Sequence, residues 1–226
     1  MSKKEKIIIY GKGDFAKLMK YNFERYSECE IVAFCVDNDF KDSDQFCNLP
    51  LISIDELPNK YNQSEYKIFV AVGYSNMRNR KIMYEKIKTL GYTCVNYISP
   101  KAIIDPTVKI GENNVILDGV IIEPFVEIGD NNIIWSGCII CHNVTILSHC
   151  FIAAQSLIGG FSVIKNNCFI GFNSTIVQNI IVEDETLVGA KSLVLNNTEK
   201  YSKYYGIPAR KISQHEYEGI KIIKKD

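Results

Sequence analysis

The sequence predicts a small α/β domain followed by a parallel β-helix. In the first half, short apolar strands alternate with helices, and in the second half an aliphatic side chain recurs at every sixth residue. A helix repeats every 3.6 residues and a strand every two, so a sustained period of six fits neither element alone. Hexapeptide repeats of this kind build a three-sided coil, with one repeat on each side.

Strands and helices alternate in residues 1–97, the expected α/β domain. Such an alternation forms a parallel sheet. The region is half the size of a full dinucleotide fold, which favours a mononucleotide over NAD as its ligand. We expect the domain boundary within Tyr97–Pro106. The expected strands are Lys6–Tyr10, Ile31–Val36, Ile52–Leu57 (with a turn) and Lys67–Val72, and the expected helices are Asp14–Arg25 and Met77–Leu90.

The aliphatic ladder occupies residues 98–198, the expected β-helix. The residue two positions before each ladder residue is mostly small, as the corners of a narrow prism require, and pairs such as Asn113-Asn114 tolerate left-handed turns. Residues 199–226 are expected to cap the open end of the prism, with a helix from Ser213. The sixteen ladder residues are Ile104, Ile110, Ile116, Ile122, Ile128, Ile134, Ile140, Ile146, Ile152, Ile158, Ile164, Ile170, Ile176, Val182, Val188 and Val194.

Composition narrows the class of protein. The formal net charge is zero and no basic cluster is interleaved with aromatic residues, which argues against a nucleic-acid partner. Neither a signal peptide nor an apolar stretch of membrane-spanning length is visible, so we expect a cytoplasmic protein. Cys138, Cys150 and Cys168 occupy small-residue positions of the β-helix, which indicates reduced thiols that act as small apolar side chains and no metal site.

Two polar segments follow strands of the α/β domain. Gly11-Lys12-Gly13 lies between a strand and a helix, where backbone N–H groups and a helix N-terminus can bind a phosphate, although the third glycine of the dinucleotide fingerprint is absent. Asp37-Asn38-Asp39 ends the second strand, where a carboxylate can accept hydrogen bonds from a ribose or base; Asp39 alternatively only forms the turn. Lys12 and Arg80 are expected either to meet a pyrophosphate or to be solvated surface residues.

The chain has three histidines. His142 lies two residues after Ile140 and is expected to project outward from the prism. His149 lies at a corner, also outward, and we expect it at the surface or at the rim of a substrate site. His215 is expected on the surface of the tail helix. On the pattern alone, an outward histidine is more often a surface residue than a catalytic base.

Several motifs occur in an order typical of one protein family. The most specific block is Cys141–Val144, Phe151–Ala154, Gly160 and Asn167–Gly171, and the outermost segments are Ile7–Gly11 and Gly206–Ala209. With these motifs the chain resembles the left-handed β-helix sugar acyltransferases that carry an N-terminal nucleotide-sugar-binding domain. This group includes the bacillosamine-pathway acetyltransferase, the sialic acid O-acetyltransferase group and the N-acetyltransferases of nucleotide-linked 4-amino-4,6-dideoxy sugars. Val72–Asn79 looks most like the last branch.

The resemblance implies roles for particular residues. His142 would be the general base, and Asn143 stands where family members often have an acidic residue, so that it can orient the ring but not stabilise its charge. A backbone N–H near Gly160 would bind the oxyanion. Alternatively, the glycines only turn corners. The resemblance also places acetyl-CoA against Phe151, Gly160, Gly171, Phe172 and Ala190, its adenine end near Gly206–Arg210, and the nucleotide sugar at Gly11, Lys12, Gly13, Asp37, Asn38 and Gly73.

The activity that the resemblance implies is transfer of an acetyl group from acetyl-CoA to the amine of a nucleotide-linked 4-amino-4,6-dideoxy sugar. The nucleotide would be dTDP, the product would enter surface glycan (lipopolysaccharide or O-antigen) biosynthesis, and the enzyme would be a homotrimer with its sites between subunits. O-acetylation of a sugar hydroxyl such as that of a sialic acid needs the same base and stays open. A non-catalytic β-helix binding module and an NAD-linked enzyme stay open as well.

Overall fold

The computed structural model describes residues 4–215 and 219–222 and divides into two compact units. The α/β unit consists of the residues up to Gly73 and Ile82–Asn96, and the prism unit consists of Tyr74–Lys81 and the residues from Tyr97 onward. The division at Asn96 lies next to the boundary expected from the sequence. The sequence did not predict that Tyr74–Lys81 belongs with the β-helix.

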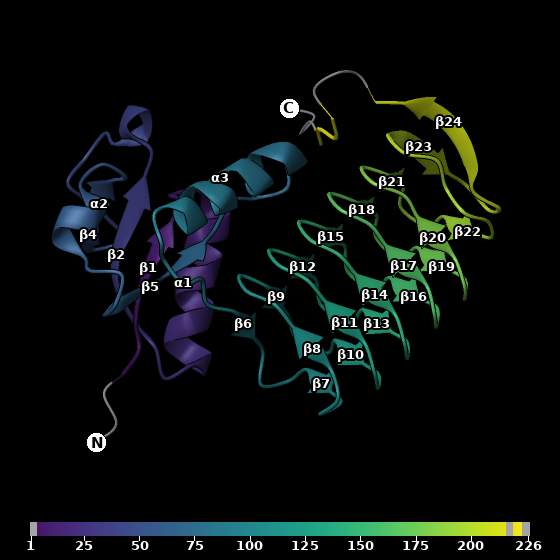
Figure 1. The fold of residues 1–226 in the computed structure, drawn as a ribbon, viewed down its shortest axis with the longest axis horizontal. Helices are drawn as coiled ribbons and strands as arrows, with labels where there is room; N and C mark the ends of the chain where they lie inside the picture. Colours follow the sequence, from purple (N-terminus) through teal and green to yellow (C-terminus); the bar gives the residue numbers. More distant parts are fainter. Residues whose placement is uncertain (1–3, 216–218, 223–226) are drawn as a thin grey trace. The chain divides into compact units, whose positions relative to one another are not determined.

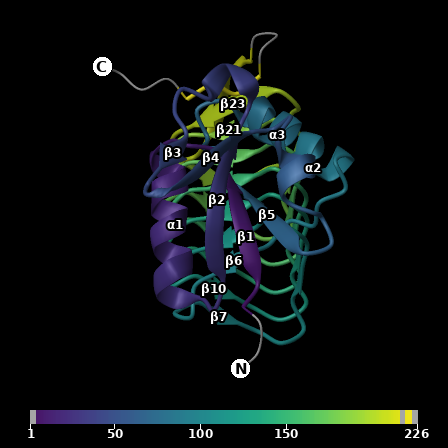
Figure 2. The ribbon, with the colours of Figure 1, turned by 90° about the vertical axis from the view of Figure 1, so that its left-hand side faces the viewer.

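A five-stranded sheet forms the centre of the α/β unit, in the order β3-β4-β2-β1-β5, with every neighbouring pair parallel except β3 and β4 (Figure 2). The expected elements are present with shifted ends. The strand and turn expected at Ile52–Leu57 are the end of a strand and a turn, but Leu57 begins a short helix that the sequence did not predict. The elements are β1 (Lys6–Tyr10), α1 (Asp14–Tyr26), β2 (Glu30–Val36), η1 (Asn38–Phe40), β3 (Gln45–Phe46), β4 (Leu49–Ser53), α2 (Leu57–Lys60), β5 (Tyr66–Val70) and α3 (Met77–Thr89).

Alternation along β1 explains the packing of this unit. Ile8 and Tyr10 join a buried cluster with Tyr84 and Ile87 from α3. On the other face, Phe23 of α1 meets Phe69 of β5 edge to face, with ring centroids 5.1 Å apart. Apolar side chains on both faces are typical of a parallel sheet covered by helices on both sides.

Strands β6 to β22 are two residues long and stack as successive coils of a β-helix (Figure 1). Residues eighteen apart pair in parallel, as in Ile121 with Ile139. We call the three sheets I, II and III. Sheet I contains β7 (Ile103–Ile104), β10 (Ile121–Ile122), β13 (Ile139–Ile140), β16 (Leu157–Ile158), β19 (Thr175–Ile176) and β22 (Leu193–Val194). Sheet II contains β8 (Lys109–Ile110), β11 (Glu127–Ile128), β14 (Thr145–Ile146), β17 (Val163–Ile164) and β20 (Ile181–Val182). Sheet III contains β6 (Tyr97–Ile98), β9 (Val115–Ile116), β12 (Ile133–Ile134), β15 (Phe151–Ile152), β18 (Phe169–Ile170), β21 (Leu187–Val188), β23 (Ser202–Tyr205) and β24 (Arg210–Gln214).

The aliphatic ladder fills the interior of the prism, as predicted. From Ile116 to Val194 every ladder residue is at most 4% exposed. The small residues two positions earlier, such as Cys138, Cys150 and Cys168, are buried beside them. The predicted period of six is therefore the period of the sides of the prism.

Each coil turns three corners, which we number by the sheet that precedes them: corner 1 follows sheet I, corner 2 sheet II and corner 3 sheet III. Asn113, Asn131 and Asn167 have φ between 56° and 57°, so the expected left-handed turns are confirmed. Asparagine is among the residues that adopt this conformation most readily.

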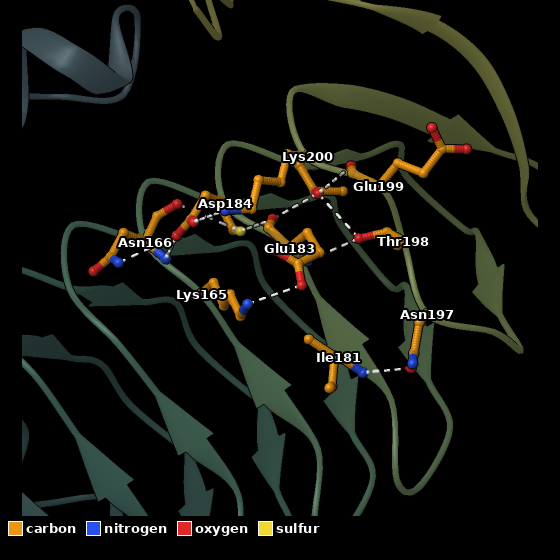
Figure 3. A network of polar contacts seen from close by, with 11 residues as sticks. Lys165, Asn166, Ile181, Glu183, Asp184, Asn197, Thr198, Glu199 and Lys200 are labelled. Carbon is orange, nitrogen blue, oxygen red and sulfur yellow. Dashed lines mark hydrogen bonds and ion pairs between the residues drawn. The ribbon is translucent and has the colours of Figure 1, made fainter.

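Side chains close the last edge of sheet II, which ends at β20 (Figure 3). Asn197 Oδ1 accepts from the N–H of Ile181 at 2.8 Å, and Thr198 Oγ1 accepts from the N–H of Glu183 at 2.8 Å. Glu183 also pairs with Lys165 at 2.8 Å. Filling the edge in this way prevents another strand from adding to it.

The tail extends sheet III and does not form the expected helix at its start. Ser213 and Gln214 belong to β24, which pairs antiparallel with β23, so the helix prediction is wrong for these residues. The edge of β23 offers backbone partners that outweigh a local helical preference. His215 is half-buried, whereas we expected it to be exposed. Residues 216–218 and 223–226, where the rest of the expected helix falls, lie outside the described residues.

Candidate active site

His142 lies at corner 1, between β13 and β14. Its backbone N–H donates to Glu123 Oε2 of the preceding coil at 2.8 Å, and its carbonyl oxygen accepts from the N–H of Phe161 of the following coil at 3.1 Å. The side chain is exposed, so the predicted outward orientation is confirmed. Two coils thus fix the backbone of this histidine while its ring faces solvent.

Asn143 orients the imidazole ring of His142. Its Oδ1 lies 3.1 Å from Nδ1 of the ring. An amide oxygen can only accept a hydrogen bond, so Nδ1 carries the proton of the neutral ring and the lone pair lies on Nε2. The Glu123 carboxylate contacts the backbone of His142 rather than the ring. This contact favours the tautomer with its proton on Nδ1.

Gly160 lies against the Cε1–Nε2 side of the His142 ring. A Cβ atom added at Gly160 would lie 3.0 Å from Cε1 and 3.1 Å from Nε2 of His142. A side chain at Gly160 would therefore require the imidazole ring to shift by a few tenths of an ångström. Within residues 4–215 and 219–222, no acceptor is recorded for the Gly160 N–H.

Phe161 lies at the same corner and contacts the His142 ring. It was not among the site residues expected from the sequence. Its ring meets that of His142 edge to face, with centroids 5.1 Å apart and an interplanar angle of 86°. The ladder offered a signal, because coil equivalence places Phe125, Asn143 and Phe161 eighteen residues apart at one corner. Phe125 and Phe161 are both exposed.

The residues expected to bind the coenzyme divide between three places. Gly160 lies with His142 at corner 1, whereas Gly171, Phe172 and Ala190 lie at corner 3, on the other side of sheet I. Phe172 and Ala190 are exposed there. A Cβ atom on the buried Gly171 would lie 2.5 Å from the backbone nitrogen of Ala190, so this glycine allows adjacent coils to pack.

Phe151, also expected at the coenzyme, lies with neither group. It belongs to sheet III and is buried. Its ring stacks on Phe169 with centroids 5.1 Å apart, and Tyr74 covers it at 4.5 Å. The ring has no exposed surface to offer a ligand in this structure.

The residues expected at the nucleotide lie at one edge of the α/β sheet, where β1, β2 and β5 end. Gly11 follows β1 with φ 127°, and a Cβ atom there would lie 2.8 Å from the Ala71 oxygen after β5. Gly13 is the N-cap of α1 and provides no side-chain cap. Asp37 and Asn38 follow β2, and Gly73 follows β5. Ligands of parallel α/β sheets bind beyond this edge.

Asp37 is a charged residue at this edge. Its Oδ1 accepts hydrogen bonds from the Tyr10 hydroxyl at 2.6 Å and from the Lys86 ammonium. Burial alone would raise the pKa of Asp37, but the hydrogen bonds from Lys86 and Tyr10 outweigh it and the pKa lies below its ordinary value. Asp37 is therefore a carboxylate at neutral pH, able to accept further hydrogen bonds.

A pocket of about 460 Å³ opens in the α/β unit, and Lys86, which the sequence analysis missed, lines it. Asp55 also lines the pocket and accepts a hydrogen bond from the Asn38 amide. Lys12 lies elsewhere at the edge and pairs with Asp42 at 2.6 Å. The other lining residues of the pocket are Ile54, Pro58, Thr89 and Leu90.

His149 is not the surface or rim residue that we expected. It is 7% exposed, and its Nδ1 lies 3.0 Å from the amide nitrogen of Asn131. Burial, reinforced by the charges of Arg80 and Lys81, lowers the pKa of His149 to about 4. The side chain does point out of the prism, but Tyr74–Lys81 belongs to the same unit and supplies Arg80 beside this corner.

Arg80 is a buried residue, so the expectation of a solvated surface position is wrong. It is 1% exposed and donates from Nη2 to the Asn131 carbonyl oxygen at 2.6 Å. Burial lowers the pKa of Arg80 to about 10. Its contacts lie within the prism unit, and nothing there presents its guanidinium to a pyrophosphate.

Cys138-Ile139-Ile140-Cys141-His142 has the Cys-x-x-Cys-His spacing that in other proteins attaches a haem. The fold separates its members. Cys138 faces the prism interior with no exposed surface and donates to the Ala153 oxygen at 3.1 Å, whereas His142 faces solvent.

More generally, the described residues contain no group of three or more His, Cys, Asp or Glu side chains arranged to hold a metal ion. In the same part of the chain, no helix has the length and apolar character to cross a membrane.

Fold and site together define a class of two-domain hexapeptide-repeat protein. Residues 94–215 match the family model described as the GMPPB C-terminal domain, which covers more than half of the chain, so the chain belongs to this family. Residues 6–87 match the model of the PglD N-terminal domain. No curated protein matches the sequence.

Solved structures with the same fold span most of the chain. A histidine mutant of GDP-perosamine N-acetyl transferase from Caulobacter crescentus, in complex with CoA and GDP-perosamine, is 23% identical with a TM-score of 0.81 and covers 95% of this chain and 99% of its own. The acetyltransferase domain of PglB from Neisseria gonorrhoeae with acetyl coenzyme A is 20% identical with a TM-score of 0.78, covering 93% and 100%. A mutant of AntD, an N-acyltransferase from Bacillus cereus, with dTDP and Coenzyme A is 23% identical with a TM-score of 0.52, covering 59% and 89%. These likenesses establish the fold, an α/β domain followed by the left-handed parallel β-helix of the hexapeptide-repeat sugar acetyltransferases.

Proposed function

We propose that the protein is an N-acetyltransferase that uses acetyl-CoA to acetylate the amine of a nucleotide-linked 4-amino-4,6-dideoxy sugar. The observation that carries the proposal is the placement of His142 Nε2 beside the Gly160 backbone, with Nδ1 oriented by Asn143. One similar protein of the same fold is named as a GDP-perosamine N-acetyl transferase and was solved with CoA and GDP-perosamine, and the residue replaced in it by mutation is a histidine. Another is named as an acetyltransferase domain and was solved with acetyl coenzyme A.

These positions support the following reaction. The sugar ammonium first loses one proton to solvent, and Nε2 of His142 accepts a second proton from the nitrogen as the free amine attacks the thioester carbonyl carbon. The carbonyl oxygen becomes an oxyanion, to which the Gly160 N–H donates a hydrogen bond. The tetrahedral intermediate then expels the coenzyme thiolate, which takes up the proton and leaves as CoA with the free thiol.

The arrangement of the corners supports a homotrimer with the coenzyme between copies. His142 at corner 1 and Phe172 at corner 3 lie on opposite sides of sheet I in one chain, so a single chain does not bring them together. The outward side chains of sheet I are exposed or half-buried and almost all aliphatic: Ile103, Ile121, Ile139, Leu157, Thr175 and Leu193. Packing this face against a second copy would bring corner 1 of one chain near corner 3 of another.

The edge of the α/β sheet supports a nucleotide as the handle of the sugar. The N-terminus of α1 beside Gly11 and Gly13 suits the diphosphate, and the ionised Asp37 suits a ribose or base. We propose dTDP as the nucleotide, on the resemblance of Val72–Asn79 to that branch. One similar structure contains GDP-perosamine and another contains dTDP, so the identity of the nucleobase has to be determined by experiment.

The test is release of the CoA thiol from acetyl-CoA with 4-amino-4,6-dideoxy sugars linked to dTDP, UDP or GDP, and with free sialic acid. The His142→Ala variant should lose kcat/KM by about 10²- to 10⁴-fold, the usual contribution of a general base. His149→Asn is the matched control, because asparagine occupies equivalent corners at Asn131 and Asn167. Retention of most activity by His142→Ala would refute the assignment of the base, and acetylation of sialic acid alone would refute the amine as acceptor.

A further inference from the structure

Phe161 occupies its position at a cost to the fold. Its backbone has φ 61°, a left-handed conformation that costs a side-chain-bearing residue about 1 kcal/mol or more relative to its usual regions. The equivalent residues of the two adjacent coils are Asn143 and Asn179, which adopt this conformation readily. The side chain is also 56% exposed, so it does not contribute to the core. The coil itself therefore gives no reason for a phenylalanine here.

The ring of Phe161 lies beside the imidazole ring that carries the proposed base nitrogen, Nε2. It meets the His142 ring edge to face at 5.1 Å, and a Cβ added at Gly160 would lie 3.1 Å from His142 Nε2. A substrate amine at Nε2 therefore has an aromatic surface next to it and a peptide N–H beside it. The neighbouring groups of the substrate must contact that aromatic surface.

We propose that Phe161 selects sugars that carry a methyl group, rather than a hydroxymethyl group, on the carbon next to the one that bears the amine. This inference rests on the proposed function. In a 4-amino-4,6-dideoxy hexose the amine and the C6 methyl are attached to adjacent ring carbons, so an amine held at His142 brings the methyl to the aromatic ring. A 6-hydroxyl in the same place would lose its water against an apolar surface without gaining a hydrogen bond.

The expected discrimination is limited in size. An apolar surface rejects an otherwise identical group that adds a hydroxyl by about 10²-fold at most. We therefore expect the protein to prefer the 6-deoxy over the 6-hydroxy 4-amino sugar, on the same nucleotide, by about 10- to 100-fold in kcat/KM. Phe161→Asn should reduce this ratio to within about threefold, mainly by gaining rate on the 6-hydroxy sugar, whose hydroxyl no longer meets an apolar surface.

The test compares kcat/KM for both sugars in the unmodified protein, in Phe161→Asn and in Phe125→Asn. Phe125 is the matched control, since it lies at the same corner with φ 64° and is 61% exposed. Asparagine suits both positions, so folding should be preserved, and melting temperatures check this. We expect Phe125→Asn to keep the ratio of the unmodified protein.

The outcomes separate this inference from the proposed function. Equal turnover of both sugars by the unmodified protein would overturn the role of Phe161 while leaving the acetyltransferase intact. An equal loss on both sugars in Phe161→Asn would also overturn it and make Phe161 a support for His142 only, as would a changed preference between acetyl-CoA and propionyl-CoA with an unchanged sugar ratio. Turnover of neither sugar would refute the proposed function itself.

Discussion

Arg80 donates a hydrogen bond from Nη2 to the main-chain oxygen of Asn131 at 2.6 Å, and so attaches Tyr74–Lys81 to corner 2 of the β-helix. The amide of the same asparagine lies 3.0 Å from Nδ1 of His149. One corner residue thus joins a buried guanidinium to a buried imidazole. Burial of the imidazole, reinforced by the positive charge of Arg80 beside it, lowers the pKa of His149 and keeps the ring neutral.

The first prediction concerns acid stability. The pKa of His149 is about 4 in the folded protein and near its ordinary 6.5 when unfolded, so the unfolded chain binds the additional proton first as pH falls. Stability is fully present above about pH 6.5 and declines toward pH 4, with a loss of about 2 kcal/mol by pH 5 from this residue. Urea unfolding at pH 7.5 and pH 5 measures it.

His149→Asn is the comparison that isolates this effect. His215, whose pKa is also lowered to about 4 by burial, contributes in the same pH range and is present in both proteins. The variant should lose less stability than the unmodified protein between pH 7.5 and pH 5. An identical loss in both would contradict the burial of His149 as a neutral ring.

The second prediction separates two adjacent glycines. In Gly160→Ala the new Cβ meets the His142 ring, so kcat/KM should fall by about 10²-fold, as for other small displacements of a catalytic group, with little change in stability. In Gly159→Ala the Cβ would lie 2.5 Å from the backbone nitrogen of Gln178, so the variant should lose about 1–3 kcal/mol of stability. Steady-state kinetics and thermal unfolding of both variants test the pair, and a stability loss confined to Gly160→Ala would contradict it.

The third prediction concerns assembly through sheet I. Leu157→Lys places a charge at the centre of its outward face, which should prevent trimer formation because a buried unpaired ammonium is costly. Val163→Lys makes the same change on sheet II and should leave the trimer intact. Light scattering after size-exclusion chromatography gives the mass of each variant. A trimer in Leu157→Lys would exclude sheet I as the interface.

The fourth prediction concerns Gly219, which has φ 75°. An added Cβ would lie 2.7 Å from Arg78 Nε and 2.8 Å from Glu185 Oε2, two residues joined by an ion pair at 3.0 Å. Gly219→Ala should therefore loosen the two hydrogen bonds between Ser75–Met77 and Ile220–Ile222. Hydrogen exchange at the amides of Met77 and Ile222 should become faster.

Gly206→Ala serves as the control for that experiment. Gly206 has φ 101°, but the nearest atom to an added Cβ is 3.5 Å away. The backbone strain is thus shared by both variants, whereas the collision with the ion pair is specific to Gly219→Ala. Equal acceleration of exchange in both variants would show that the backbone strain of the substitution, and not the collision with the ion pair, causes the faster exchange.

The periodic part of the fold could be predicted because each side of the prism needs one apolar residue at a fixed position of the sequence. Each ladder residue must be apolar to fill a prism one coil wide, so the period of six identified the interior and, with it, the outward position of His142. In the same way, strands such as Lys6–Tyr10 are apolar because both faces of their sheet are covered.

The sequence could not show which outward residues are buried, because their burial depends on a segment that is distant in the chain. His149 and Phe151 face outward as their positions in the coil require, but Tyr74–Lys81 packs on both regions and buries them. The tail likewise follows the free edge of β23 instead of its local preference. Phe161 was missed because its eighteen-residue spacing from Phe125 identifies the corner but not a role, and its contact with the ring of His142 is visible only in the structure.

The pairing of residues eighteen apart limits how this protein can change in length. A deletion or insertion of one whole coil would return every later side chain to its former side, whereas any length that is not a multiple of six would turn aliphatic residues outward and polar residues inward. Evolutionary changes in the separation between Gly160 and Phe172 should therefore occur in whole coils.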